Sequence, residues 1–197
     1  GGARCGSTFC GVSWGGCDIP SDGNVMANGK IRIAVAAWLS DATAAEATYG
    51  HISTWATGGV TDMSYLFSDA SAFDQDIGAW DTSGVTSMYG MFRYASSFDQ
   101  DIGGWNVDKV TAMVLMFEGA TAFDQDLSWC VAFLTPSVFD PLVDGYTIQD
   151  AFSGTQCEST PCSGTQCLTQ TGSSWCGVKQ DSACSGVTRP RPSPSPP

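Results

Sequence analysis

The feature that most constrains this chain is an internal repeat with a period of 25 residues. Three stretches align without gaps, namely residues 60–84, 85–109 and 110–130, the last of which breaks off before its period is complete. In repeat proteins one unit cannot bury its apolar side chains alone, and stacking of neighbouring units builds one continuous core. The sequence therefore predicts an α/β repeat solenoid.

Apolar residues recur at fixed places in each repeat. The columns are Val60/Val85/Val110, Met63/Met88/Met113, Phe67/Phe92/Phe117, Phe73/Phe98/Phe123 and Ile77/Ile102/Leu127. A tryptophan column, Trp55/Trp80/Trp105, starts earlier, and Ile52 extends the isoleucine column in the same way. Residues 51–55 are therefore interpreted as the tail of an incomplete earlier repeat, and the same period places Cys130 in the tryptophan column.

Each repeat combines two kinds of spacing. The segment MxxxFxxA has helical or 3₁₀ spacing, whereas FDQDIGxW alternates apolar and polar residues as a short strand does. Glycine and an Asx-Thr-Ser stretch follow the tryptophan and indicate a turn. We therefore expect one short strand and one tight helical turn per repeat, with parallel strands stacking along the axis.

Solenoids need covered ends. At the N-terminal end, helical spacing is seen for Ile31, Val35, Trp38, Leu39 and Ala42. We expect Asp41 to cap a second short helix that Gly50 ends. At the other end, residues 148–157 resemble a final half repeat with Phe152 in the phenylalanine column, and a disulfide between Cys130 and Cys157 is one hypothesis for closing it.

The pattern VTxMxxMFxxASSFDQDIGxWDTSxVTxM resembles the BspA-like leucine-rich-repeat family of surface proteins from bacteria, protists and algae. The segment AWLSDATAAEATYGHISTW is similar to the one that precedes these repeats in algal and stramenopile members. The resemblance covers residues 31–157, about two-thirds of the chain. It implies a leucine-rich-repeat-like right-handed coil and an extracellular or cell-surface location, but no particular ligand. Asparagine is common in the family where this chain has Asp74, Asp99 and Asp124.

Cysteine usage also indicates an oxidising compartment. The nine cysteines cluster toward the two ends, and all are disulfide candidates: Cys5, Cys10, Cys17, Cys130, Cys157, Cys162, Cys167, Cys176 and Cys184. Because nine is odd, one thiol is expected to be free or to pair with another chain. The sequence does not decide the connectivity.

The charge balance bears on partners. A formal net charge of −12 repels phosphate backbones, so we expect no nucleic-acid partner. No apolar run is long enough to span a bilayer, so we expect no membrane span. The chain begins at Gly1 without methionine or a signal peptide, and we expect a processed chain or a fragment of a longer one.

The two ends resemble each other. GSTFCGVSWGGC (6–17) and GSSWCGVKQDSAC (172–184) share a Gly-Ser-Ser/Thr-aromatic-Cys-Gly-Val pattern. They are interpreted as two copies of a small cysteine module, as one unit of a longer tandem array, or as a chance similarity. Like modules at both ends would suit head-to-tail contact between copies. The expected division is 1–29 (cysteine-rich), 30–157 (repeats with caps), 158–188 (cysteine-rich) and 189–197 (Pro/Ser-rich tail).

The tail RPRPSPSPP favours polyproline II. Next to the algal resemblance it looks like hydroxyproline-rich glycoprotein sequence, and a bare flexible linker is the alternative. The O-glycosylation candidates are Pro190, Pro192, Ser193, Pro194, Ser195, Pro196 and Pro197. The sequence holds no Asn-X-Ser/Thr acceptor for N-glycosylation.

The repeated Asp-Gln-Asp triplet is the strongest candidate for a metal site. Stacked repeats would place two columns of carboxylates close together, which calcium would neutralise: Asp74, Asp76, Asp99, Asp101, Asp124 and Asp126. The alternative is that these carboxylates accept backbone N–H groups in turns. A repeated column is unlike the single asymmetric carboxylate pair of a glycoside hydrolase, so that activity is not expected.

Other chemistry is weakly represented. The one histidine, His51, is interpreted as a packed or capping residue, and no nucleophile elbow, zinc motif or phosphate loop is present. An outward-facing tryptophan column would stack sugars, whereas an inward-facing one would be core. We therefore predict a non-enzyme: an extracellular structural subunit that self-associates into a fibril or coat. The alternatives are a monomeric adhesion or glycan-binding module and a calcium-stabilised surface repeat protein.

Overall fold

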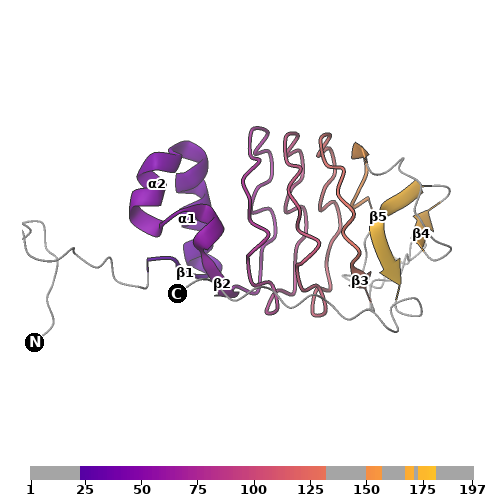
Figure 1. The fold of residues 1–197 in the computed structure, drawn as a ribbon, viewed down its shortest axis with the longest axis horizontal. Coiled ribbons are helices and arrows are strands. Elements are labelled where there is room, and N and C mark those ends of the chain that lie inside the picture. Colours follow the sequence, from indigo (N-terminus) through magenta and orange to yellow (C-terminus); the bar gives the residue numbers. More distant parts are fainter. Residues whose placement is uncertain (1–22, 132–149, 157–166, 171–172, 181–197) are drawn as a thin grey trace, which may run out of the picture.

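The computed structural model describes residues 23–131, 150–156, 167–170 and 173–180. Along its long axis lie a pair of helices, then a row of coils standing side by side, and then a small sheet (Figure 1). We call residues 60–84, 85–109 and 110–129 the first, second and third coil. In the described part of the chain, no helix combines the length and the apolar character needed to cross a membrane.

The helical cap precedes the coils. Strand β1 (Val25–Ala27) leads into α1 (Asn28–Ser40), α2 (Ala42–Tyr49) and a 3₁₀ helix, η1 (Ile52–Thr54). Strand β2 (Ala56–Gly59) then pairs with β1 in parallel. As predicted, the Asp41 side chain caps α2 by accepting the N–H of Ala44 at 3.1 Å, and α2 ends at Gly50, where φ is +74°.

Only part of the predicted apolar stripe of α1 is buried. Ile31, Val35 and Trp38 pack into the core together with Ala34, as the 3.6-residue period requires. Leu39, which shared the predicted stripe, keeps 45% of its surface exposed. The helices therefore cover the coils with one face, and Leu39 stands at the rim of that face.

The expected helical turn in each coil is instead a run of tight turns. In the first coil the N–H groups of Leu66, Ser68 and Ala70 bond three residues back, while those between them bond the next coil. Tyr65 and Asp69 have φ of +57° and +61°, a conformation that a right-handed helix cannot contain but that suits the third residue of a type II turn. In a helix every N–H would bond a carbonyl of the same helix. Here successive N–H groups bond alternately to a carbonyl of their own turn and to one of the next coil.

The expected strand also lies elsewhere. The segment FDQDIGxW forms no strand, and isolated parallel bridges instead join Asp62 to Ser87 and Ser87 to Ala112. At FDQDIGxW the coils are connected largely through side chains, as described below. The alternation of apolar and polar residues therefore reflects side chains that face the core or the solvent in turn. It does not require a continuous ladder of backbone hydrogen bonds between coils.

The predicted columns form the core. Aromatic rings stack on their equivalents one repeat away: centroids are 5.5 Å apart for Phe67 and Phe92, 5.9 Å for Phe73 and Phe98, and 6.4 Å for Trp80 and Trp105. Members of all five predicted columns are at most 5% exposed. Such stacking contributes beyond simple area burial.

The C-terminal end confirms one prediction and corrects another. Phe152 stacks on Phe117 with centroids 5.3 Å apart, so the half repeat at residues 150–156 continues the phenylalanine column as predicted. Trp129, and not Cys130, occupies the tryptophan column and is 2% exposed. Ser128 adopts a positive φ of 47° just before it, and the third coil is one residue shorter than the period predicts.

A three-stranded sheet closes the described structure at this end. Strand β5 (Ser173–Gln180) lies between β3 (Cys130–Val131), which it pairs in parallel, and β4 (Cys167–Gln170), which it pairs antiparallel. Val178 on β5 is fully buried in the common core. The cysteine-rich segment after residue 157 thus contributes strands to the end of the repeat row.

Candidate functional site

The first aspartate of the first and second Asp-Gln-Asp triplets joins two coils. Asp74 Oδ1 accepts the backbone N–H of Asp99 at 3.0 Å and Nε2 of Gln100 at 2.7 Å. Asp99 Oδ1 repeats both contacts one coil later, with Asp124 N–H at 2.9 Å and Gln125 Nε2 at 2.8 Å. Each carboxylate is held by amide donors of the next coil, so the Asp-Gln pair acts as a side-chain link between repeats.

The second aspartate of each triplet serves its own turn. Oδ1 of Asp76, Asp101 and Asp126 accepts the N–H two residues later, at 2.9, 2.9 and 3.1 Å. This is the Asx-turn arrangement. Both columns therefore make the backbone contacts that were the alternative to calcium binding, and among the described residues no group of three or more His, Cys, Asp or Glu is placed to hold a metal ion.

The tryptophan column faces inward. Trp55, Trp80 and Trp105 are at most 3% exposed. Nε1 of Trp80 donates to the carbonyl of Ile52 at 2.9 Å, and Nε1 of Trp105 to that of Ile77 at 3.1 Å. A buried indole needs such an acceptor. The hypothesis of an outward-facing tryptophan ladder for sugars is therefore wrong.

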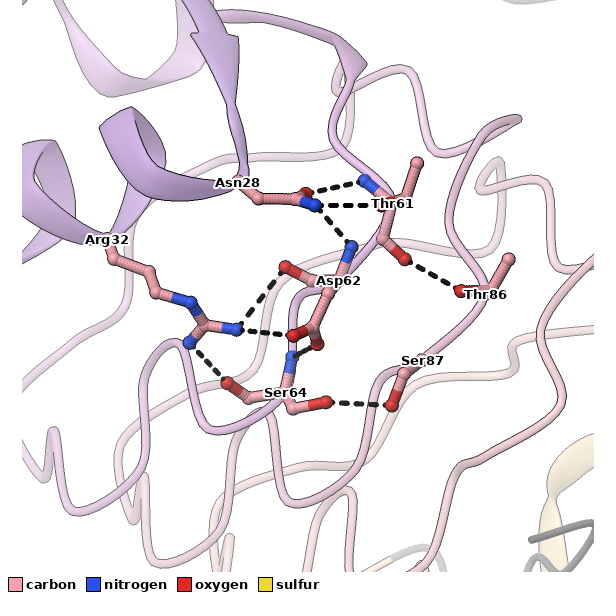
Figure 2. Close-up of polar contacts among 7 residues, drawn as sticks. All are labelled: Asn28, Arg32, Thr61, Asp62, Ser64, Thr86 and Ser87. Carbon is pink, nitrogen blue, oxygen red and sulfur yellow. Dashed lines mark hydrogen bonds and ion pairs between the residues drawn. The ribbon is translucent and has the colours of Figure 1, made fainter.

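Asn28, the first residue of α1, covers part of the open edge of the first coil (Figure 2). Its Oδ1 accepts the N–H groups of Thr61 and Asp62 at 2.8 and 3.1 Å, and its Nδ2 donates to Thr61 Oγ1 at 2.8 Å. In the later coils the equivalent N–H of Thr86 bonds the backbone carbonyl of Thr61. One side-chain amide thus replaces a missing preceding coil, a role that the sequence pattern did not reveal.

Arg32, one turn along α1, covers the adjoining part of that edge (Figure 2). Its guanidinium donates to the Ser64 carbonyl at 2.7 Å and forms an ion pair with Asp62 at 3.0 Å. Burial alone would raise the pKa of Asp62, but hydrogen bonds from Ser64 and the Arg32 charge outweigh it and lower the pKa below 3.8. The Asp62 carboxylate is therefore held ionised between helix and coil.

An exposed tyrosine cluster lies on the turn segments of the coils. The rings of Tyr65 and Tyr89 are 5.1 Å apart, and the Arg93 guanidinium lies 4.8 Å from the ring centre of Tyr94 while pairing with Glu118. A hydrogen bond with Tyr65 is the main reason that the pKa of Tyr89 is raised. Tyr65 and Tyr94 are 50% and 43% exposed.

Glycine one period later makes room for each of these exposed rings. A Cβ on Gly90 would lie 2.7 Å from the Tyr65 ring, and one on Gly119 would lie 2.4 Å from Tyr94. Sequence reasoning missed this cluster, although the signal is readable as a tyrosine followed by glycine 25 residues on. The spacing allows an aromatic ring to lie against the neighbouring backbone.

The remaining candidate residues divide into two groups. His51 packs edge-on against Trp38 at 5.2 Å and caps η1 through the N–H of Ser53, so it is both packed and capping, as predicted. The O-glycosylation candidates, the side chains of the nine cysteines and the hypothetical Cys130–Cys157 bridge lie outside the described residues.

Comparison with known protein families yields a match over half of the chain. Residues 37–138 match the family described as "Mycoplasma protein of unknown function, DUF285". No curated protein and no solved structure matches the chain. The matched stretch begins within α1, contains all three coils and makes up more than half of the 197 residues. The chain therefore belongs to the DUF285 family.

Proposed function

We propose that this chain is an extracellular structural protein of the BspA-like type, built as a right-handed leucine-rich-repeat-like solenoid and acting without catalysis. The observation that carries the proposal is how the polar side chains of the repeats are used. Asp74, Asp99 and their glutamine partners join coil to coil, and Thr57 and Thr82 donate to the carbonyls of Asp81 and Asn106 at 3.0 Å. This chemistry maintains a rigid repeating surface.

Self-association into a fibril or coat is the form of this function that the chain ends favour. The odd cysteine number and the similar cysteine-containing stretches supply the means for covalent or head-to-tail contact between copies. The Pro/Ser tail would carry O-linked sugars. Negative-stain microscopy, non-reducing electrophoresis and the intact mass of protein from its native source would test this. Filaments and excess mass are expected, and a strictly monomeric protein without added mass would contradict it.

The tyrosine cluster favours glycan binding as a second function. Exposed aromatic rings beside a charged hydrogen-bonding pair such as Arg93 and Glu118 offer stacking and polar contacts together. Tyr65→Ala should reduce retention on a glycan array, whereas Tyr49→Ala, a change beside the core at the cap, should leave retention intact. Equal retention of both variants and the parent chain would remove this candidate.

Calcium stabilisation rests on the two carboxylate columns. If calcium bridges neighbouring coils there, adding calcium to chelator-treated protein should raise its Tm, and Asp76→Asn with Asp101→Asn should remove the increase. An unchanged Tm in calcium and in chelator would exclude the calcium proposal. The hydrogen bonds to Asp74 and Asp99 then suffice without a metal.

A further inference from the structure

The edge of each coil that faces its predecessor follows a regular bonding rule. The carbonyls of Met91 and Arg93 in the second coil accept the N–H groups of Phe67 and Asp69 at 2.8 and 2.7 Å. In the third coil, Met116 and Glu118 accept from the corresponding N–H groups of the second at 2.8 and 2.7 Å. Every second carbonyl along the turn segment is thus satisfied by the preceding coil.

The first coil has the same row of carbonyls but no preceding coil. Arg32 reaches the first two, at Asp62 and Ser64, over 3.5 and 2.7 Å. The next two belong to Leu66 and Ser68, and no donor from the described residues meets either of them. The helical cap therefore covers one half of this edge and leaves the other half open.

Two donor groups on the open half likewise lack a partner. In the second coil the N–H of Ser97 bonds the preceding Ser71 carbonyl at 3.2 Å, and Gln100 Nε2 bonds Asp74. The equivalents in the first coil are the N–H of Ala72 and Nε2 of Gln75, and neither meets an acceptor within the described part of the chain. The open edge thus offers two acceptors and two donors in the arrangement that a polypeptide backbone satisfies elsewhere.

A groove runs along this open half. It has a volume of about 430 Å³, and its lining includes Trp38 and Leu39 of α1 together with Ser68, Ala72 and Gln75 of the first coil. This volume lies within the range of small-molecule and cofactor sites in proteins. Apolar side chains of α1 and the unused polar groups of Ser68, Ala72 and Gln75 therefore line the same groove.

We propose that this groove binds an extended polypeptide segment of a partner, which adds to the first coil as a short substitute for the missing predecessor. Strand addition of this kind draws its affinity from backbone hydrogen bonds and its selectivity from alternate side chains. The second coil shows what the occupant must supply, because its residues 92–100, FRYASSFDQ, hold the same row of the third coil. The ligand is thus an extended peptide whose N–H groups are free at alternate residues, as those of Phe92 and Tyr94 are toward the third coil.

The probe is a fluorescent peptide of sequence FRYASSFDQ, titrated with the full chain and followed by anisotropy. Saturable binding is expected, and a scrambled peptide should bind about tenfold more weakly. N-methylation at the first or third residue removes an N–H that would meet Leu66 or Ser68 and should weaken binding severalfold. N-methylation at the second residue should not, because the corresponding N–H of Arg93 bonds within its own coil.

Two variants of α1 provide a matched pair. Leu39→Glu places a charge in the groove wall and should weaken peptide binding at least tenfold. Ile33→Glu alters another exposed apolar residue of α1 that does not line the groove, and it should leave the affinity unchanged. Both residues are solvent-exposed, so thermal unfolding of the two variants should match that of the parent chain.

Three results would overturn the proposal. The first is an absence of saturable binding to the parent chain, and the second is a loss of affinity that is the same for all three N-methylated peptides. The third is concentration-dependent self-association that Leu39→Glu abolishes, which would assign the groove to a second copy of this chain. The first two results leave the coat proposal untouched, whereas the third would overturn the peptide proposal and support self-association, so failure of one proposal can be told from failure of the other.

Discussion

The two neighbours of the first coil cover it by different means. On one side, the second coil accepts four N–H groups from the first with backbone carbonyls, from Met63 to Asp69. On the other side, the helical cap uses two side chains, Asn28 and Arg32. The second coil provides hydrogen-bond partners along the whole turn segment of the first coil. The cap provides them along only half of the opposite edge. The difference shows that capping a repeat row does not require another repeat.

The cause of this difference is how each element uses its backbone. An α-helix bonds its N–H and carbonyl groups along its own axis, so α1 has few of them to offer sideways. A coil made of alternating turns keeps every second N–H free for the next coil. The helices must therefore cap the first coil with side chains. A side chain reaches only the part of the coil edge that lies near its own position on the helix.

The largest expected loss of stability comes from a substitution within the stacked coils. Phe92 stacks on Phe67 and Phe117 and is fully buried, so Phe92→Ala should lower the free energy of unfolding by about 3–5 kcal/mol. Chemical denaturation would measure it. Tyr94→Ala, on the same coil but 43% exposed, should cost clearly less, and equal losses would mean that the stacked column is not the core.

Substitutions in the helical cap should lower the stability less than Phe92→Ala does, and the loss should depend on one side chain, Asn28. Asn28→Ala leaves the N–H groups of Thr61 and Asp62 without their acceptor and should cost about 1–2 kcal/mol. Asn28→Asp keeps the accepting oxygen and loses only the donor to Thr61 Oγ1, so its loss should be smaller. If both variants unfold like the parent chain in denaturant, Asn28 is not a cap.

Substitutions of Asp99, which links two coils through its side chain, should lower the stability by different amounts. Asp99→Ala removes the acceptor for Asp124 N–H and Gln125 Nε2 and should cost about 1 kcal/mol. Asp99→Asn keeps an oxygen in place and should be close to neutral in thermal unfolding. A large loss for Asn would indicate that the charge at this position matters more than the hydrogen bonds.

The smallest expected effect concerns pH at the cap. The pKa of Asp62 is lowered in the folded protein, so its contribution to stability is present above its unfolded pKa of about 3.8 and is lost as the pH falls through the folded value. Arg32→Gln should raise this pKa toward 3.8, as followed by NMR of the carboxyl carbon. The stability advantage of the parent chain over this variant should shrink on acidification. An unchanged Asp62 titration would show that Arg32 does not act on it.

Much of the architecture was predictable because burial is periodic. The valine, methionine, phenylalanine and isoleucine columns, the half repeat at Phe152 and the Asp41 cap all follow from residue spacing. The place of Trp129 was missed because the repeats were aligned without gaps, whereas the third coil lacks one residue before the tryptophan and has a positive φ at Ser128. The tyrosine cluster was missed because an exposed tyrosine carries no periodic signal unless the glycine one repeat later is read with it.

The sequence by itself determined which side chains face inward and that the coils are copies of one another, because a 25-residue period must place equivalent residues in equivalent surroundings. Only the tertiary structure decided how the coils are joined and where the row is left open. Those outcomes depend on which N–H groups point sideways and on whether Asn28 and Arg32 reach the first coil. Such contacts join residues about 30 positions apart, and local spacing carries no information about them.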